Sequence, residues 1–323
     1  MVCYWKMDVK GAQGMKKWLA RILTAIMLSS LFMFMGCESP LETQGNIGSV
    51  GENKAAFYLL KPTTGSQMMG IVIQTANKKT IVVDGGTRGD SKQLRNFIKQ
   101  GANGHIDAWF FTHPHQDHLG AFCDMFDKKI TVDKIYHHFP SMEELVVYGY
   151  RNDDELKIWQ IATAKFEGTF KNQVQIVQAG DVFYVDEIKI TVLRIYNPTT
   201  TANFVNNSSV VYRIENAETS FLILGDLGEE GGKELMENCP LELLQTDYTQ
   251  MAHHGQAGVS KEFYAYIHPK RCIWPTPAWL WDNDNGDGFD TGPWVTVRTR
   301  EWMEELGVIE HWVAKDGIQV IAF

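Results

Sequence analysis

Cysteine is scarce in this chain, with five residues in 323. Beyond position 37 only Cys123, Cys239 and Cys272 remain. An odd and widely spaced set of three does not make a disulfide framework, and no CxxC pair indicates a zinc knuckle. Disulfides and cysteine-bound zinc are therefore excluded as the basis of the fold.

Basic residues are also in deficit, because 30 Lys and Arg stand against 39 Asp and Glu and give a formal net charge of −9. Residues 1–36 hold five basic residues and one acidic residue, so the chain without them carries −13. General nucleic-acid binders gain affinity by neutralising phosphates with Lys and Arg. The charge balance therefore argues against nucleic acid as a partner.

Neither a repeat of fixed period nor a low-complexity tract is present. The composition is 44% hydrophobic, 12% aromatic and 21% charged, which excludes a disordered or fibrous chain. The length fits one large domain or two small ones. We therefore expect a globular fold with a sizeable core.

The N-terminal segment has the pattern of a secretory signal. Lys16 and Lys17 precede an apolar run over residues 18–35, and a glycine and Cys37 follow. The last four residues of this pattern, Phe-Met-Gly-Cys, resemble a bacterial lipobox, whose cysteine is acylated and becomes the mature N-terminus. The alternative is a buried N-terminal helix with an incidental cysteine.

The signal pattern divides the chain into three parts. We expect a signal peptide over residues 1–36, with Met15 as an alternative start, and a lipidated tether over 37–54, which is rich in Gly, Ser, Glu and Asn. The folded domain is expected over 55–323. The protein is accordingly expected outside the cytoplasm, as a lipoprotein anchored to the membrane through Cys37.

The rest of the chain alternates between strand-like and helix-like patterns. Apolar and β-branched runs predict strands over 57–61, 70–74, 80–84, 107–112, 174–178, 188–195, 209–214, 220–224, 248–252 and 317–323. Helical patterns lie over 91–100, from about 117, and over 154–166, 261–267 and 295–306. Runs of strands with interspersed helices, in two halves of similar order, predict an α/β fold of two packed sheets with helices outside.

The densest chemical motif follows the strand predicted over 107–112. His113, His115, Asp117 and His118 place three imidazoles and one carboxylate within six residues. His113 and His115 point to the same side of an extended segment and can bind one ion. Asp117 and His118, at the start of the next helix, can address a second. Nitrogen and oxygen donors suit zinc, manganese or iron.

This His-x-His-x-Asp-His motif resembles the signature of the metallo-β-lactamase superfamily, and the resemblance covers roughly residues 57–323. It implies an αββα sandwich, two mixed sheets with helices on the outer faces, and two divalent metals, zinc being favoured. Asp84, in Asp-Gly-Gly, would support the ligands. Asp226, in Leu-Gly-Asp after a strand, would bridge both metals.

The last expected ligand is a histidine after a later strand, where His253 and His254 are adjacent. Adjacent side chains on extended backbone diverge, so both should not bind the same ion. We favour His254 as the ligand of the second metal. His253 would then face the substrate or support the ligands.

One departure from the family narrows the resemblance. Most members supply another histidine before the Gly-Asp, where this chain has Asn-Asn-Ser-Ser-Val-Val-Tyr over 206–212. This segment, the His-His-Gly and the ending 314–320 resemble the ComEC-type branch, which includes competence proteins and teichoic-acid phosphorylcholine esterases. Asn207 would support the ligands or face the substrate. The first site would keep His113, His115 and Asp226, and we expect it to be weakly occupied.

The resemblance implies a hydrolase that uses a metal-activated water, with Asp117 as the catalytic residue that orients this water and moves a proton. We expect a phosphodiesterase acting on a small extracellular phosphodiester, such as a headgroup or an envelope glycopolymer. A β-lactam or lactone hydrolase is disfavoured by the missing histidine, and a nuclease by the charge. The complete motif argues against a non-catalytic envelope-binding lipoprotein.

The lipobox generates the first prediction. Cys37→Ser should release the protein from membranes without altering its activity, because the lipid acts only as an anchor. Membrane fractionation of cells that produce each form measures this. Unchanged fractionation of the variant would count against the lipobox.

Overall fold

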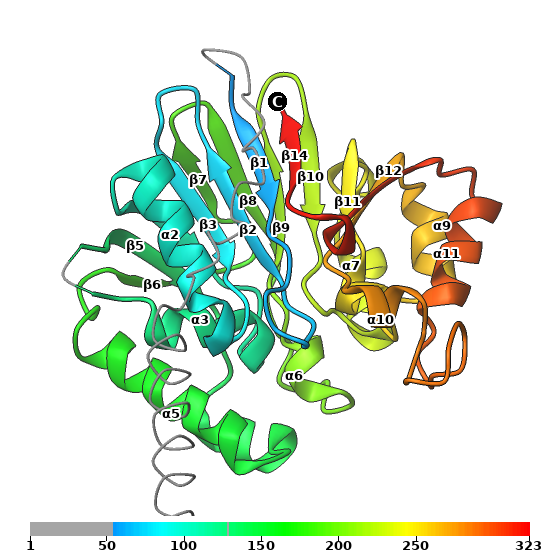
Figure 1. The fold of residues 1–323 in the computed structure, drawn as a ribbon, viewed down its shortest axis with the longest axis horizontal. Helices are drawn as coiled ribbons and strands as arrows, with labels where there is room; N and C mark the ends of the chain where they lie inside the picture. Colours follow the sequence, from blue (N-terminus) through cyan, green and yellow to red (C-terminus); the bar gives the residue numbers. More distant parts are fainter. Residues whose placement is uncertain (1–53, 128) are drawn as a thin grey trace, which may run out of the picture. The chain divides into compact units, whose positions relative to one another are not determined.

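The computed structural model describes residues 54–127 and 129–323. The predicted signal peptide, Cys37 and all but the last residue of the predicted tether lie outside these residues. Two seven-stranded sheets organise the described part (Figure 1). Within it, no helix has the length and apolar character needed to cross a membrane.

The first sheet has the strand order β14-β1-β2-β3-β4-β5-β6. Its strands are β1 (Ala56–Leu59), β2 (Gly70–Gln74), β3 (Thr80–Asp84), β4 (His105–Phe110), β5 (Thr131–His137), β6 (Val174–Ile176) and β14 (Gln319–Ala322). The pairs from β14 to β3 are antiparallel, and those from β3 to β6 are parallel. The last strand of the chain therefore pairs with the first.

The second sheet has the order β13-β12-β11-β10-β9-β8-β7. Its strands are β7 (Val182–Val185), β8 (Ile188–Arg194), β9 (Val211–Glu215), β10 (Ser220–Ile223), β11 (Tyr248–Gln250), β12 (Arg271–Trp274) and β13 (Glu310–Val313). The strands from β7 to β10 are antiparallel, and those from β10 to β13 are parallel. Both sheets thus combine antiparallel and parallel halves.

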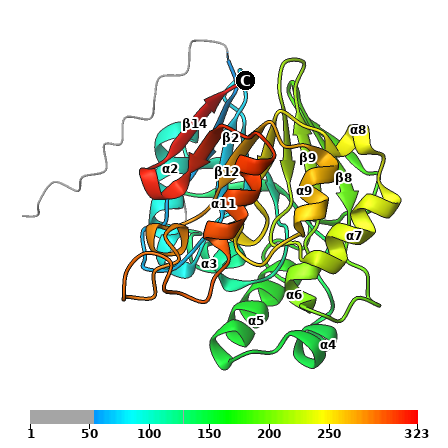
Figure 2. The same ribbon diagram turned by 90° about the vertical axis from the view of Figure 1, so that its right-hand side faces the viewer.

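Helices cover the outer face of each sheet (Figures 1 and 2). Apolar side chains of α2 (Ser91–Ala102), α3 (Gln116–Asp124) and α5 (Asp153–Glu167) pack on the first sheet. Those of α7 (Glu229–Asn238), α9 (Lys261–Ile267) and α11 (Thr296–Glu305) pack on the second. The shorter helical segments are η1 (Arg88–Asp90), α4 (Met142–Glu144), η2 (Leu145–Gly149), α6 (Phe204–Asn207), α8 (Leu241–Leu244), η3 (Ala252–Gly255), α10 (Ala278–Trp281) and η4 (Ala314–Asp316).

The two sheets pack face to face through an apolar core. Along β1, Phe57 and Leu59 point into this core while Ala56 and Tyr58 point toward the helices, as the period of two in a strand requires. Phe57 stacks on Phe221 of β10 with ring centroids 4.5 Å apart. The predicted fold class, two packed mixed sheets with helices outside, is confirmed.

The sequence patterns did not predict several of the strands and one of the long helices. The bounds of β2, β3 and α9 are those predicted, but β5, β7, β12, β13 and α7 were not predicted. In β5 an exposed residue is followed by a buried one and then by two more exposed ones, which breaks the alternation that marks a half-buried strand. Two adjacent glycines weaken the helical pattern of α7.

The helix that carries part of the motif approaches the neighbouring backbone closely at Gly120. A Cβ atom there would lie 2.6 Å from the backbone nitrogen of Arg88 and 2.9 Å from the carbonyl carbon of Thr87. Only glycine lets α3 lie this near η1, and Ala121 N donates to Gly86 O at 2.8 Å beside it. This contact sets the position of the first turn of α3.

We therefore expect Gly120→Ala to lower the free energy of unfolding by about 1–3 kcal/mol, as overpacking does. Urea denaturation of metal-free protein measures the change. Gly65→Ala is the matched control, since nothing lies within 4 Å of a Cβ atom there. Equal midpoints for the two variants would contradict the packing argument.

Candidate metal centre

The first sheet delivers the histidine motif to one end of the sandwich. β4 ends at Phe110, and His113 and His115 lie in the short segment between β4 and α3. Asp117 and His118 occupy the first turn of α3. His113 and His118 are fully buried, and Asp117 is 9% exposed. Helix and strand therefore hold the four side chains in a largely closed environment.

The second sheet contributes the remaining candidates from the ends of β10 and β11. Asp226 follows β10 through Gly225, whose φ of 58° and close neighbours, Thr112 and Ser209, leave no room for a side chain. His254 lies in η3, directly after β11 and Met251. Both side chains are buried. The loops of the two sheets meet at this point.

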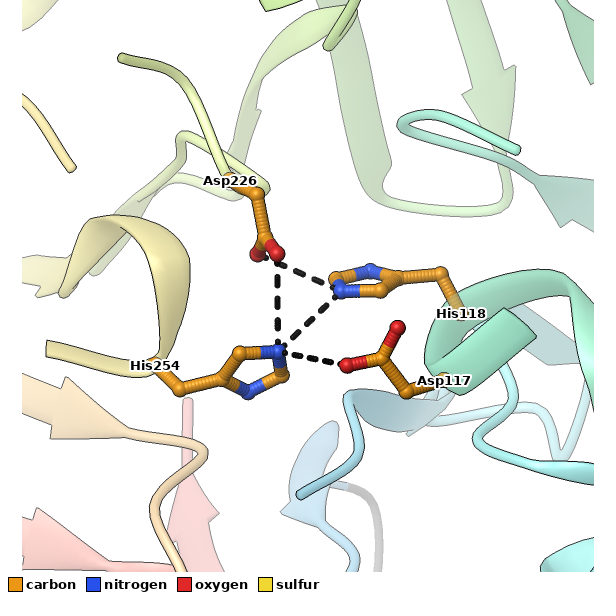
Figure 3. Close-up of side chains that lie close together, drawn as sticks. All are labelled: Asp117, His118, Asp226 and His254. Carbon is orange, nitrogen blue, oxygen red and sulfur yellow. Dashed lines mark hydrogen bonds and ion pairs between the residues drawn. The ribbon is translucent and has the colours of Figure 1, made fainter. Parts of the chain in front are cut away.

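Four side chains converge in the first of two groups (Figure 3). His118 Nε2 lies 3.2 Å from Asp226 Oδ1, and His254 Nε2 lies 3.2 Å from Asp117 Oδ2 and 3.5 Å from Asp226 Oδ2. The two Nε2 atoms are 3.3 Å apart. The nitrogen and oxygen atoms of all four residues thus face a common point.

A second group shares the carboxylate of Asp226. His113 Nε2 lies 3.7 Å from Asp226 Oδ2 and 3.0 Å from His115 Nδ1. Sharing one carboxylate between two groups is possible because its two oxygens can bind separate ions. The structure therefore brings together the residues proposed for the first site, His113, His115 and Asp226, as well as those proposed for the second.

The unsatisfied atoms at the centre fit a metal. Asp226 is 1% exposed, and neither of its carboxylate oxygens accepts a hydrogen bond from the described residues. A buried carboxylate in this state is costly unless it is paired or coordinates a cation. Imidazole nitrogen and carboxylate oxygen are donors for zinc, manganese or iron. The two groups therefore fit a pair of divalent ions.

The histidines differ in protonation when no metal is bound. Burial lowers the pKa of His113 well below its ordinary value and the pKa of His115 to about 3. Burial opposes charge on His118 and His254 too, but neighbouring carboxylates, Asp226 foremost, raise the pKa of His118 well above its ordinary value and that of His254 to about 9. Binding of a metal at the four-residue group must therefore displace protons.

Hydrogen bonds on the far side of each ring hold two of the histidines in place. Asp84 Oδ2 lies 2.8 Å from His118 Nδ1, and Asp84 Oδ1 accepts from Thr112 N. His254 Nδ1 donates to the carbonyl of Pro275 at 2.8 Å. Such partners fix the ring orientation and leave Nε2 free to bind a metal. Asp84 thus contacts a candidate ligand, as the resemblance implies.

His253 lies just outside the four-residue group. The backbone of His253 and His254 is left-handed, with φ of 51° and 55°, and not extended as the sequence argument assumed. His253 Nε2 is 3.9 Å from Asp226 Oδ2, and its Nδ1 donates to Ala257 O. The side chain of His253 is 17% exposed while that of His254 is fully buried, so of the two only His253 is accessible to solvent.

Asn207 supports the segment that follows Asp226. Its Oδ1 accepts from the backbone of Gly228 and Gly231, and its Nδ2 donates to Glu230 at the start of α7. The neighbouring Asn206 was not proposed from the sequence, yet its Nδ2 lies 3.4 Å from His253 Nε2. Its Oδ1 is buried with no hydrogen-bond partner in the part of the chain that the structure describes.

Sequence reasoning also missed a pair of glutamines at the centre. Gln67 Nε2 donates to Asp117 Oδ2 at 2.9 Å, and Gln256 Nε2 donates to Gln67 Oε1. Burial by itself would raise the pKa of Asp117, but the hydrogen bond to His254 and the charge of His118 hold it below its ordinary value. Asp117 is therefore ionised and oriented. No pattern in the sequence marks either glutamine.

A protein-family model matches the part of the chain that forms this centre. The model described as the metallo-beta-lactamase superfamily matches residues 67–269, which is more than half of the chain. The chain belongs to the metallo-beta-lactamase superfamily. The matched range contains Asp84, the complete histidine motif, Asp226 and His254. With its buried histidine and aspartate centre, this metallo-beta-lactamase superfamily member is a metal-dependent hydrolase.

The chain is similar in sequence or in fold to several known proteins. It is 29% identical over 171 residues to ComE operon protein 3 of Bacillus subtilis (strain 168); the match covers 52% of the chain and 20% of that protein. The chain thus spans about a fifth of this relative's length. The metallo-beta-lactamase fold protein YhfI of Bacillus subtilis is 12% identical, with a TM-score of 0.49 over 84% of this chain and 100% of that one. A diphosphatase of the PhnP family is 13% identical, with a TM-score of 0.43 over 83% and 97%.

The shared carboxylate generates a prediction about metal content. Asp226→Ala should lower the metal bound at both groups, whereas His113→Ala should mainly empty the group of His113 and His115. Elemental analysis of purified protein gives the metal per chain. The exposed His268, replaced by Asn, is the matched control. Equal, near-full loading of both variants would contradict the assignment.

Proposed function

We propose that the protein is a phosphodiesterase that hydrolyses a small phosphodiester of the bacterial envelope. The observation that carries this proposal is the pair of donor groups joined by the buried carboxylate of Asp226. When bound there, two divalent ions would activate a water and stabilise the charge that develops on the phosphoryl oxygens. In-line phosphoryl transfer is one of the reactions that such paired sites favour.

Asp117 is the candidate for handling protons. Its Oδ2 accepts a hydrogen bond from Gln67 and faces His254, so the carboxylate is held in one orientation. An ionised and oriented carboxylate beside the reacting centre can align the attacking water and pass its proton to the leaving group. Asp117 combines this role with that of a ligand.

The accessible imidazole beside the centre suits a substrate with an anionic group. His253 brings an imidazole within 3.9 Å of Asp226 and belongs to neither donor group. The fully buried Asn206 places its Nδ2 3.4 Å from His253 Nε2. When both of its ring nitrogens carry a proton, His253 can donate from Nε2 to a phosphoryl oxygen while Nδ1 donates to Ala257 O, and such charge-assisted bonds are stronger than neutral ones. We assign His253 to substrate binding, and Asn206 to the support of the His253 ring.

Net charge restricts the class of phosphodiester. The chain carries −9 overall, which disfavours long polyanions such as DNA and favours a small or zwitterionic diester. The similarity to ComE operon protein 3 and the Asn-Asn-Ser-Ser segment support a place in the ComEC-type branch, near the phosphorylcholine esterases. A headgroup or an envelope glycopolymer is the substrate that we propose.

The lipobox completes this proposal. An acylated Cys37 would hold the domain at the outer surface of a membrane, where envelope phosphodiesters are found. The tether of residues 37–54 would let the domain reach substrates at a distance from the lipid surface. Location and substrate class are therefore consistent with each other.

The test of the mechanism is Asp117→Asn. Because the amide cannot take a proton from water, turnover of bis-p-nitrophenyl phosphate should fall about 10²- to 10⁴-fold while the fold persists. Circular dichroism checks the fold, and the release of p-nitrophenol gives the rate.

Two outcomes would contradict the mechanism or the substrate class. If Asp117→Asn hydrolyses the diester as fast as the unmodified protein, Asp117 is not the catalytic residue. If the metal-loaded protein cleaves the β-lactam nitrocefin or a lactone but no phosphodiester, the reaction belongs to the alternative classes, and the proposed substrate is wrong.

The assignment of His253 gives a separate prediction. His253→Ala should keep the full metal content and raise KM about 10-fold, as expected for the loss of one hydrogen bond to a charged group. His254→Ala is the matched comparison, because it should lose the metal held by the four-residue group. Metal loss in the His253 variant with retention in the His254 variant would reverse the two assignments.

A further inference from the structure

One buried carboxylate near the metal centre has no part in the mechanism above. Glu155 is 3% exposed and lies in the first turn of α5. Its backbone N–H donates to the side chain of Asn152, which caps the helix, at 2.9 Å. The cap therefore sets the start of α5, in whose first turn Glu155 lies.

The carboxylate of Glu155 faces His115 on the side away from the metal groups. Glu155 Oε1 lies 3.6 Å from His115 Nε2. This nitrogen is buried and has no hydrogen-bond partner within residues 54–127 and 129–323. The other ring nitrogen, Nδ1, lies 3.0 Å from His113 Nε2. His115 thus presents Nδ1 to the first metal group and Nε2 to Glu155.

The same helix holds the loop that carries His115. One turn beyond Glu155, Trp159 Nε1 donates to the carbonyl of Pro114 at 2.8 Å. Pro114 is the residue between His113 and His115. Two residues of α5 therefore contact the short segment 113–115. Trp159 contacts the backbone of the segment, and Glu155 contacts the ring of His115.

The chemistry of imidazole decides what Glu155 does. A neutral histidine that offers Nδ1 as a lone pair must carry its proton on Nε2. That N–H is buried, so it needs an acceptor, and the carboxylate of Glu155 is the acceptor that faces it. A carboxylate in this place fixes the tautomer and makes the bound nitrogen a stronger donor.

We infer that Glu155 is a positioning residue for the first metal group, which holds His115 as the tautomer that binds metal through Nδ1. Metal binding depends on this role more here than in a site with three histidine ligands, because His113 and His115 are the only histidines of this group among the described residues. The inference concerns metal binding and is independent of the substrate proposed above.

The test compares Glu155→Leu, Glu155→Gln and the matched control Asp154→Asn. Asp154 lies in the same turn of α5, but its side chain is 85% exposed and pairs with Lys157. Zinc is titrated into the metal-free full-length chain in competition with a chelator, which gives the affinity of each of the two equivalents. Circular dichroism of the metal-free variants checks that each one is folded.

Glu155→Leu should weaken one zinc equivalent about 10- to 100-fold and leave the other unchanged, as loss of a partner behind a ligand does. Glu155→Gln should weaken the binding of this zinc equivalent less, because the amide oxygen of glutamine still accepts a hydrogen bond. Asp154→Asn should bind both equivalents like the unmodified chain. A folded Leu variant with unchanged affinities, or with both equivalents weakened equally, would overturn the inference.

A second measurement needs no variant of Glu155 and covers the case in which the Leu variant does not fold. Nitrogen NMR of histidine-labelled, zinc-loaded protein reports which ring nitrogen carries the proton. The signals of His115 are assigned from the spectrum of His115→Gln. A proton on Nε2 supports the inference, and a proton on Nδ1 overturns it.

Discussion

The buried carboxylate of Asp226 is the interaction on which the rest of the site depends. It is nearly inaccessible to water, so its charge must be balanced by groups that the fold brings to it. His118 and His113 approach it from the first sheet, and His254 approaches from the second. The apolar core that joins the sheets therefore also sets the geometry of the metal centre. Any shift of one sheet against the other would separate the donors.

Backbone strain is concentrated around this carboxylate. Asp84, His253 and His254 have positive φ angles without being glycine, and Gly225 adopts the same region directly before Asp226. Such conformations persist only where neighbours hold them. Trp109 Nε1 donates to the carbonyl of Asp84, and Thr276 Oγ1 to that of His254. The protein thus holds energetically unfavourable backbone conformations at the positions that orient candidate ligands.

The two donor groups are unequal, and this inequality bears on how the centre is loaded. One group has two carboxylates and two histidines, whereas the other has two histidines and shares the carboxylate of Asp226. The poorer group has a buried carboxylate of its own nearby, Glu155, on the outer side of His115. A site with few ligands depends more on what orients each of them, which gives α5 a part in metal binding.

Local sequence determined the histidine motif, its place between a strand and a helix, and the order of the later candidates, because these depend on neighbours in the chain. It also determined the two-sheet class through alternation, although β5 was missed because its burial does not alternate cleanly. Only the tertiary structure decided which of His253 and His254 enters the metal group, since a left-handed turn replaces the extended backbone that the sequence suggested. It alone brought Gln67 to Asp117 and Glu155 to His115, over 50 and 40 positions of the chain. Contacts at such separations follow from how sheets and helices pack, and no local pattern encodes them.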